Sequence, residues 1–185
     1  MDEKLLFFST FIRYPKEIGS IMPSSKFLVK EIIKNINFDN AKYMMEYGPG
    51  TGCVTVEILK RARKDAKILC FEVNRRFCRY LRKNINDNRL VIINDGAENI
   101  NKHLKKLGIS KIDYVISGLP FSALDSYKKC IIIEKTKNKL KSNGKFVVYQ
   151  FLNNFKRYLY NYFSNISIKF VPLNIPPCFV YVCEK

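Results

Sequence analysis

The chain has 185 residues, of which 47% are hydrophobic, and it carries 33 lysine or arginine residues against 16 aspartate or glutamate residues. This length suits one domain, and the apolar fraction is large enough to bury a core, so intrinsic disorder is not expected. The formal net charge of +17 predicts attraction to a polyanion, either nucleic acid or an anionic membrane surface, and charge alone does not separate the two.

The composition also argues against several kinds of chemistry. Six cysteines are scattered without a Cys-x-x-Cys pair, which is typical of reduced core thiols and not of a disulfide framework or a zinc site. His103 is the only histidine, so serine–histidine catalysis and histidine metal sites lack their components. There is no secretory signal and no apolar run of about 18 residues. The sequence therefore predicts a cytoplasmic protein that holds no metal and cannot span a bilayer.

Residues 1–40 are predicted to form a helical cap ahead of a core at residues 41–185. Between residues 2 and 14, three phenylalanines share one face at helical spacing, namely Phe7, Phe8 and Phe11. This face either packs on the core or enters the headgroup region of an anionic membrane, where neighbouring cationic side chains would meet the lipid. The two roles are compatible if the helix docks loosely on the core.

The segment that follows this helix is irregular. Pro15, Gly19 and Pro23 prevent one continuous helix, so the segment either connects two helices or folds over a ligand. Ser24 or Ser25 is placed to cap a further helix, predicted at residues 25–37.

A strand, a tight turn and a helix are predicted around three glycines at alternate positions. The apolar run at residues 41–47 leads into Gly48, Gly50 and Gly52, and residues 53–62 then have apolar side chains at helical spacing. Because glycine lacks a Cβ atom and accepts positive φ, a ligand can lie against this loop, beside the N–H groups that open the helix. Such a loop suits a nucleotide-like ligand.

The residue before these glycines indicates which ligand. Dinucleotide-binding loops read Gly-x-Gly-x-x-Gly and hold pyrophosphate, whereas here the last gap is one residue and Glu46 precedes the turn. A carboxylate repels phosphate and attracts a cation, such as the ammonium and sulfonium of S-adenosylmethionine. The pattern Glu-x-Gly-x-Gly-x-Gly resembles the first motif of the class I S-adenosylmethionine-dependent methyltransferases. A purely structural turn between strand and helix is the alternative.

Acidic residues also come at the ends of the next two predicted strands. The strand at residues 67–73 contains Glu72, which lies 22 residues beyond Gly50. This is about the interval at which βαβ nucleotide sites place an acid on the ribose hydroxyls. The strand at residues 89–94 is followed by Asp95, which is placed to accept from an adenine amino group. An ordinary Asp-Gly turn is the alternative for Asp95.

The alternation of strands and helices continues to the end of the chain. Further strands are predicted at 111–116, 145–151, 166–171 and 179–183, and further helices at 75–85, 99–107, 127–140 and 153–163, with a turn at 141–144. This order predicts an α/β fold with a doubly wound Rossmann-like sheet, N-terminal helices and an antiparallel C-terminal hairpin. Ligands of such sheets lie at the carboxyl ends of the strands, where Glu46, Glu72, Asp95 and Ser117 fall.

The fourth predicted strand leads into the most specific motif, Ser117-Gly-Leu-Pro-Phe121. It occupies the position of the Asn/Asp-Pro-Pro-Tyr-like motif of amino-directed methyltransferases and is similar to the Asn-Leu-Pro-Tyr of ribosomal RNA adenine dimethylases, with serine in place of asparagine. Together with the segment 11–25, the glycine loop and the closing Pro176-Pro177-x-x-Val-Tyr181, it makes nearly the whole chain resemble the bacterial phospholipid N-methyltransferases. Phe121, where leucine is often seen in that family, and Tyr47 are departures.

The resemblance implies a peripheral enzyme on the inner face of the membrane that uses S-adenosylmethionine to methylate the amine of a lipid headgroup. The headgroup is that of phosphatidylethanolamine, one of its methylated forms or an ornithine lipid. The implied cofactor-binding residues are Ser24, Glu46, Gly48, Pro49, Gly50, Thr51, Gly52, Glu72, Val73, Asp95, Gly96, Ala97 and Ser117. Ser117 is also expected to accept a hydrogen bond from the attacking amine, with Tyr14 as a proton relay. The expected substrate pocket consists of Gly118, Leu119, Pro120, Phe121, Tyr127 and Tyr181, because aromatic faces bind an alkylated ammonium.

Two other activities compete with lipid methylation. An RNA adenine N6-methyltransferase is favoured by the charge and by Leu119-Pro120-Phe121, but Ser117 lacks the carboxamide that would hold a base amine. A methyltransferase of small amines without lipid affinity is the third possibility.

Overall fold

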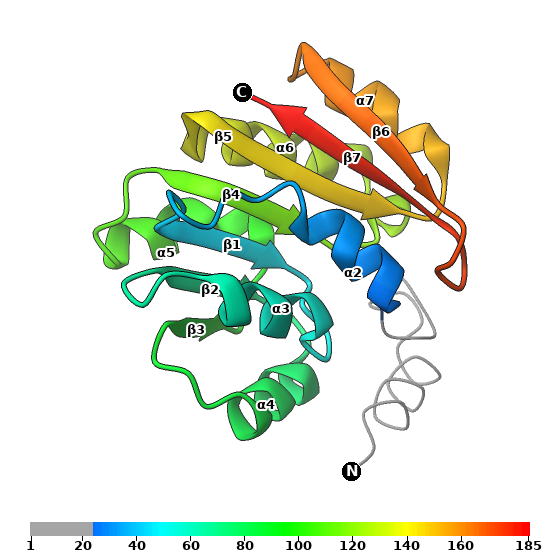
Figure 1. Cartoon of the computed structure of the whole chain (residues 1–185). Helices are drawn as coiled ribbons and strands as arrows, with labels where there is room; N and C mark the ends of the chain where they lie inside the picture. Colours follow the sequence, from blue (N-terminus) through cyan, green and yellow to red (C-terminus); the bar gives the residue numbers. More distant parts are fainter. Residues whose placement is uncertain (1–23) are drawn as a thin grey trace.

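The computed structural model describes residues 24–185, which form one seven-stranded sheet in the order β3-β2-β1-β4-β5-β7-β6 (Figure 1). The strands are β1 (Tyr43–Tyr47), β2 (Lys67–Phe71), β3 (Leu90–Ile93), β4 (Ile112–Ser117), β5 (Leu140–Gln150), β6 (Asn165–Val171) and β7 (Cys178–Glu184). The first five are parallel, and β7 pairs antiparallel with both β5 and β6. The predicted doubly wound sheet with an antiparallel hairpin is confirmed.

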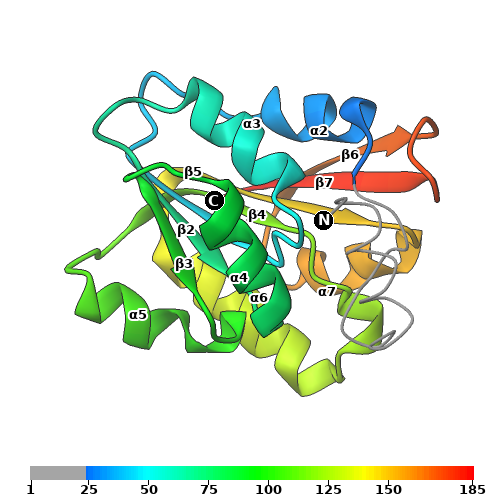
Figure 2. The same ribbon diagram turned by 90° about the horizontal axis from the view of Figure 1, so that it is seen from below.

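Helices cover both faces of the sheet (Figure 2). They are α2 (Lys26–Ile33), α3 (Cys53–Arg61), α4 (Arg75–Asn84), α5 (Ile100–Lys106), α6 (Ser126–Lys139) and α7 (Lys156–Tyr160). Short 3-10 turns, at Ala97–Asn99, Phe121–Ala123 and Asn153–Phe155, precede α5, α6 and α7. Helices α2 and α3 lie on one face, and α5, α6 and α7 lie on the other.

The core is divided between these two faces because successive side chains of a strand point in opposite directions. In β1, Met45 and Tyr47 belong to the cluster under α5 and α6, whereas Met44 belongs to the cluster under α2 and α3. The hydroxyl of the buried Tyr47 lies 3.1 Å from Thr136 Oγ1 of α6. By the same alternation Glu46 lies on the α3 side of the sheet.

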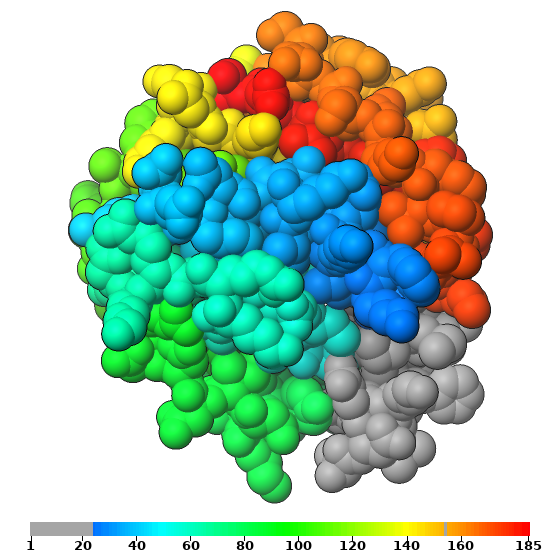
Figure 3. Space-filling view, viewed as in Figure 1, coloured from blue at the N-terminus to red at the C-terminus, as the bar shows by residue number. Residues whose placement is uncertain are grey.

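The N-terminal cap is described only from residue 24 onwards. The helix predicted at residues 2–14, the irregular segment up to Pro23 and the proposed relay Tyr14 lie outside the described residues. Ser25 caps α2 by accepting from the backbone N–H of Leu28, as predicted. Figure 3 shows α2 lying between α3 and the β6–β7 hairpin. The buried face of α2, including Leu28 and Ile32, belongs to the same core cluster as Met44 of β1. Residues 24–40 thus pack directly on the predicted core.

One predicted element is wrong. Residues 141–144 were expected to be a turn before the fifth strand, but they lie within β5, where its register against β4 shifts between Ile112 and Tyr114. The bulge approaches the neighbouring strand closely, because a Cβ atom on Gly144 would lie 2.9 Å from the Asp113 carbonyl oxygen. Asp113 also forms an ion pair with Lys141. Pairing with β4 holds at Leu140 and resumes at Lys145, so these turn-forming residues bulge out between two paired positions and do not end the strand.

No helix within residues 24–185 has the length and apolar character needed to cross a membrane.

Candidate active site

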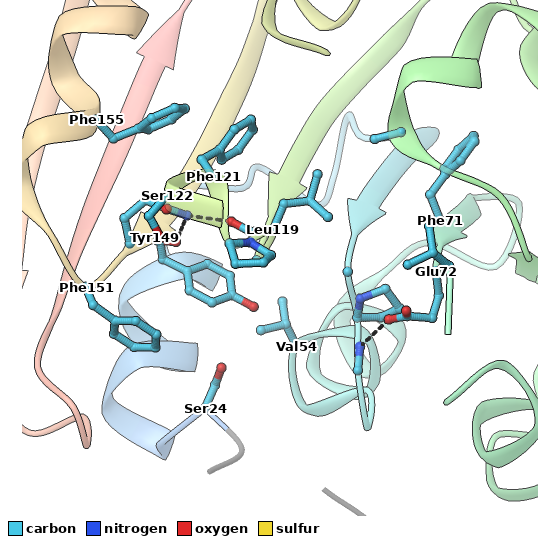
Figure 4. A pocket seen from close by; sticks show the side chains of 18 of the residues that line it. Ser24, Val54, Phe71, Glu72, Leu119, Phe121, Ser122, Tyr149, Phe151 and Phe155 are labelled. Atoms are coloured by element: carbon cyan, nitrogen blue, oxygen red, sulfur yellow. Dashed lines mark hydrogen bonds between the residues drawn. The ribbon is translucent and has the colours of Figure 1, made fainter. Parts of the chain in front are cut away.

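A cavity of about 300 Å³ lies at the carboxyl ends of the parallel strands (Figure 4). One end, which we call the glycine-loop end, is lined by residues 48–51, Glu72 and Asp95. The other, the aromatic end, is lined by Phe121, Phe151, Phe155 and Tyr158. Figure 4 shows Glu72 on one side of this cavity and Phe121 with Phe155 on the other, so the two ends belong to different loops. The cavity is where the strand order predicted a ligand.

The glycine loop has the left-handed conformation that its glycines predicted. Gly48, Gly50 and Gly52 have φ angles of 67°, 57° and 88°. Gly48 and Gly50 line the cavity, but Gly52 does not. A Cβ atom on Gly52 would lie 2.7 Å from the Leu81 side chain, so the third glycine lets α4 pack closely under the loop. Gly52 was predicted to contact a ligand, but it does not form part of the cavity wall.

Glu72 lies at the cavity immediately after β2, as its spacing predicted. Its two carboxylate oxygens accept from the backbone N–H groups of Gly50 and Asn74, at 3.2 and 2.8 Å. Asn74 in turn caps α4 by accepting from Arg76 N. These bonds orient the carboxylate between the glycine loop and α4. The next residue, Val73, also lines the cavity and is 52% exposed.

Asp95 follows β3 and lines the cavity, but its carboxylate has several partners within the chain. It lies 2.7 Å from His103 Nε2 and accepts from Asn99 Nδ2 at 2.7 Å and from the Gly96 N–H at 2.8 Å. These bonds, above all the one with His103, lower the pKa of Asp95 to about 2. His103, which the sequence left without a role, therefore holds Asp95 in place. Ala97 lines the cavity beside it, whereas Gly96 does not.

Glu46 is in a different position from the one predicted. Its side chain is 1% exposed and is not part of the cavity wall. Oε2 accepts from Thr55 Oγ1 at 2.6 Å, and among the described residues Oε1 has no hydrogen-bond partner. Burial, with a smaller contribution from the charge of Glu72, raises the pKa of Glu46 to about 7. A direct contact with a ligand would require the side chain or the loop to move.

The loop after β4 forms the boundary between the two ends of the cavity. Gly118, Leu119, Pro120 and Phe121 line it, as predicted, whereas Ser117 is fully buried. Ser117 Oγ accepts from the Leu119 N–H at 3.4 Å, so the hydroxyl stabilises the turn and does not face the cavity.

Residues of β5 support this turn from the other side. A Cβ atom on Gly118 would lie 2.1 Å from Tyr149 Oη, so only glycine fits beneath that ring. Gln150 Nε2 donates to the carbonyl oxygens of Leu119, at 2.7 Å, and Tyr149, at 2.6 Å. The turn is thus held between β1 and β5 with little freedom to move.

The aromatic end differs most from the prediction. Phe121 stacks on Phe155, with ring centroids 4.3 Å apart, and Tyr158 also stacks on Phe155, with their centroids 6.0 Å apart. Tyr181 lies behind Phe155 in the core, where its hydroxyl donates to Asn153 Oδ1 at 3.0 Å. Tyr127 is 78% exposed and does not line the cavity. Of the predicted aromatic residues within the described chain, only Phe121 contributes to the wall.

Several lining residues were missed. Tyr149, Phe151, Phe155 and Lys129 line the cavity and were not predicted. Ser24, which was predicted to contact the cofactor, lines it as well. Tyr149 and Phe151 come at the end of the fifth parallel strand, so extending the strand-end rule by one strand would have found them. Phe155 and Lys129 carry no local signal, because α6 and α7 reach the cavity only through tertiary packing.

Residues 16–110, just over half of the chain, match the family described as ribosomal RNA adenine dimethylase. The chain belongs to the ribosomal RNA adenine dimethylase family. The segment that carries the match contains β1 to β3 and the loops of the glycine-loop end, and it stops before β4. Family membership therefore rests on the half of the molecule that forms the glycine-loop end.

Two relatives of this dimethylase-family chain differ in how much of it they cover. It is 28% identical over its whole length to an ornithine lipid N-methyltransferase of Singulisphaera acidiphila, of which the alignment covers 97%. It is 34% identical to the ribosomal RNA small subunit methyltransferase A of Wigglesworthia glossinidia brevipalpis, over 63% of this chain and 47% of that protein. The chain spans less than half the length of that ribosomal RNA methyltransferase.

Solved structures share the fold of this family member. The precorrin-6y C5,15-methyltransferase of Geobacter metallireducens has a TM-score of 0.69 at 14% identity and covers 85% of this chain and 88% of its own. A Streptococcus mutans protein in complex with S-adenosylhomocysteine has a TM-score of 0.59 at 17% identity, over 85% and 95% of the two chains. The fold is that of the class I methyltransferases. The chain is a methyltransferase that uses S-adenosylmethionine.

The glycine-loop end of this methyltransferase fits that cofactor. The carboxylates of Glu72 and Asp95 lie there, and no lysine or arginine of residues 24–185 lines this end. This arrangement favours a cationic ligand over a pyrophosphate. When bound, S-adenosylmethionine supplies an electrophilic methyl group on its sulfonium. The chain itself provides the backbone of Gly48 and Gly50, an acid after β2 and the turn that separates the glycine-loop end from the aromatic end.

Proposed function

We propose that this methyltransferase acts on the amine of a membrane lipid headgroup, such as phosphatidylethanolamine, its partly methylated forms or ornithine lipid. The observation that carries the proposal is the difference in coverage between the family match and the alignment with the ornithine lipid N-methyltransferase. The match to the ribosomal RNA dimethylase family ends at residue 110, before the acceptor turn at 117–121. The alignment with the ornithine lipid N-methyltransferase includes that turn and the whole aromatic end.

The aromatic end supports an alkylated amine as acceptor. Each methyl transfer removes an N–H donor and leaves a cation, which aromatic faces bind without needing that donor. Phe121 and Tyr158 each stack against Phe155 along this wall. The Gln150 carboxamide, which could otherwise hold a base, donates to backbone carbonyls of its own chain.

In the proposed reaction the turn positions the acceptor. Methyl transfer needs a neutral amine whose lone pair points at the methyl carbon from about 3 Å, and holding that geometry supplies most of the acceleration. The carbonyl groups on either side of Gly118 would accept hydrogen bonds from the amine, while Ser117 acts as a positioning residue through its bond to Leu119. The ethanolamine nitrogen must first lose a proton, and Tyr14 remains the predicted relay.

Glu72 and Asp95 are proposed to bind the cofactor through its ribose and its adenine amino group, respectively. Glu46 is proposed to act on the methionine end from beneath the loop. Its buried carboxyl group would influence the cationic end of the ligand through its charge, and Thr55 keeps one of its oxygens fixed.

Contact with the membrane is proposed for the cap at residues 1–40, with the protein peripheral on the inner face. The charge of +17 favours an anionic surface. Replacing Phe7, Phe8 and Phe11 together with alanine should weaken flotation with anionic liposomes and leave cofactor binding unchanged. Equal flotation of the triple variant and the wild type would remove this helix as an anchor.

A labelled methyl-transfer assay tests the acceptor. The full chain is incubated with labelled S-adenosylmethionine and with vesicles containing phosphatidylethanolamine, vesicles containing ornithine lipid, or RNA, and a Glu72→Ala variant serves as the inactive control. Label in an extracted lipid is expected. Mass spectrometry of lipids from a host that lacks methylated lipids, before and after expression of the chain, identifies the product.

RNA adenine N6-methylation is the second candidate, because the family match and the positive charge both favour it. Label in RNA alone, with none in either kind of vesicle, would reject the lipid proposal in its favour. Label in a free amine such as ethanolamine, with none in RNA or in vesicle lipid, would indicate a small-amine methyltransferase.

A further inference from the structure

Two cationic side chains line the aromatic end of the cavity and share one aromatic ring. Lys129 of α6 has its Nζ atom 5.1 Å from the centroid of the Tyr158 ring, and Arg157 of α7 has its Cζ atom 5.2 Å from the same centroid. All three residues belong to the cavity lining. The Tyr158 hydroxyl lies 3.3 Å from Ser126 Oγ, which fixes the ring between the two helices. We call Lys129, Arg157 and Tyr158 the cationic rim.

The cations of this rim have no carboxylate partner in the part of the chain that the structure describes. The neighbouring Lys128 forms an ion pair with Glu98 at 2.7 Å, whereas neither Lys129 nor Arg157 takes part in an ion pair within residues 24–185. A cation–π contact does not neutralise the charge of the cation, so the cation still attracts an anion. The two side chains therefore present positive charge to whatever occupies the aromatic end.

Charge in the cavity is divided along its length. The acids Glu72 and Asp95 line the glycine-loop end, where the positively charged methyl donor fits. The cationic rim lies at the opposite end, because Tyr158 stacks on Phe155, which Figure 4 places across the cavity from Glu72. A neutral or purely cationic acceptor would gain nothing from such a rim. An acceptor that carries a negative group beside its amine would match both ends.

We infer that the cationic rim is a subsite for an anion, a phosphodiester or a carboxylate, that is joined to the acceptor amine within one zwitterionic headgroup. This inference rests on the proposed lipid function and specifies its substrate class. Arginine binds such planar or tetrahedral oxyanions with two parallel hydrogen bonds, and lysine adds a point charge. The rim would thereby hold the amine at the Gly118 turn and discriminate against long-chain amines without a neighbouring anion.

Leu152 marks where the rest of such a lipid would leave the site. It lines the cavity and is 57% exposed. An exposed apolar side chain in the wall of the same cavity suits a molecule whose charged headgroup continues into acyl chains.

The test compares acceptors with and without the anion, using the full chain. The acceptors are phosphatidylethanolamine, ornithine lipid and octadecylamine, each in vesicles of the same neutral carrier lipid, and kcat/KM is measured for each. The test variant is Lys129→Ala/Arg157→Ala. The matched control is Lys105→Ala/Lys106→Ala, which removes the same charge from exposed positions on α5 that do not line the cavity.

Loss of two charge-assisted contacts should lower kcat/KM of the test variant for a zwitterionic lipid by roughly 10- to 100-fold and change that for octadecylamine by less than about twofold. The affinity for S-adenosylhomocysteine in calorimetry and the flotation with vesicles should equal those of the control variant. Inorganic phosphate at millimolar concentration should inhibit the wild type competitively against lipid and should not inhibit the test variant.

Three results would overturn the inference. If the test variant keeps the wild-type preference for zwitterionic lipid over octadecylamine, the rim does not read the anion, even if free phosphate inhibits. If both acceptors lose activity equally and flotation falls, the rim only attracts the protein to the surface. If the wild type methylates RNA and no vesicle lipid, the proposed function fails and the subsite fails with it, which differs from the first result because there the wild type methylates lipid.

Discussion

Replacing Glu46 with glutamine should stabilise the protein against unfolding, and the gain should increase with pH. The Glu46 carboxyl group is 1% exposed, and within the described chain Oε1 has no partner. Burial raises its pKa from the usual 4.5 to about 7. The unfolded chain loses this proton near pH 4.5, whereas the folded chain keeps it until about pH 7. Stability contributed by the protonated group is therefore present at low pH and is lost as the pH rises.

The size of the effect follows from the two pKa values. At about 1.4 kcal/mol for each pKa unit, the interval from 4.5 to about 7 is worth about 3 kcal/mol of unfolding free energy. Glutamine resembles the protonated acid in shape and has no charge to bury. The variant should thus be more stable than the wild type by less than about 1 kcal/mol at pH 5 and by about 3 kcal/mol at pH 8.

Urea denaturation of both proteins at pH 5, 6, 7 and 8 measures this difference, and other titrating groups cancel in it. Glu57→Gln is the matched control, because hydrogen bonds with Lys60 and Arg61 lower the pKa of Glu57, so its effect should be constant above pH 5. A Glu46→Gln difference that is equally constant from pH 5 to pH 8 would refute the reasoning, since the buried carboxyl group would then ionise at an ordinary pH.

Two further predictions concern the cavity walls. Glu72→Ala should abolish S-adenosylmethionine binding in calorimetry, because the carboxylate after β2 is lost; an unchanged affinity would exclude Glu72 from the ribose site. Gly118→Ala should lower the unfolding free energy and the rate of methyl transfer, because the new Cβ atom would lie 2.1 Å from Tyr149 Oη. In a double-mutant cycle with Tyr149→Ala this cost should shrink, and strictly additive costs would show that the ring is not what excludes the side chain.

The division of charge in the cavity links the site to the fold. The acids come from loops on one side of the switch in strand order, after β2 and β3, and the cations come from α6 and α7 on the other side. A methyl donor with a positive sulfonium could therefore lie near the acids while an acceptor's anionic group lies near the cations, so that like charges do not face each other in the cavity.

Much of the fold could be predicted because the relevant patterns are local. The alternation of apolar runs with helical spacing predicted every parallel strand, and the hairpin at the end followed from the last two runs. The glycine loop and the interval to Glu72 predicted the glycine-loop end, since a βαβ unit determines which loops meet there. The bulge at residues 141–144 was missed, because it depends on β4 pairing with Leu140 before it and with Lys145 after it, which no local residue reports.

The class of fold, the type of cofactor and the turn at Ser117–Phe121 follow from the amino-acid sequence alone, because each depends on neighbouring residues and on the connection of strands through short loops. Which side chains face the cavity depends instead on how the elements pack against one another. Alternation along β1 puts Glu46 on the α3 side of the sheet. Packing on the opposite face buries Tyr181 behind Phe155, and the approach of α6 to α7 brings Lys129 and Arg157 over one ring. Those outcomes depend on contacts between residues far apart in the chain, which sequence spacing does not encode.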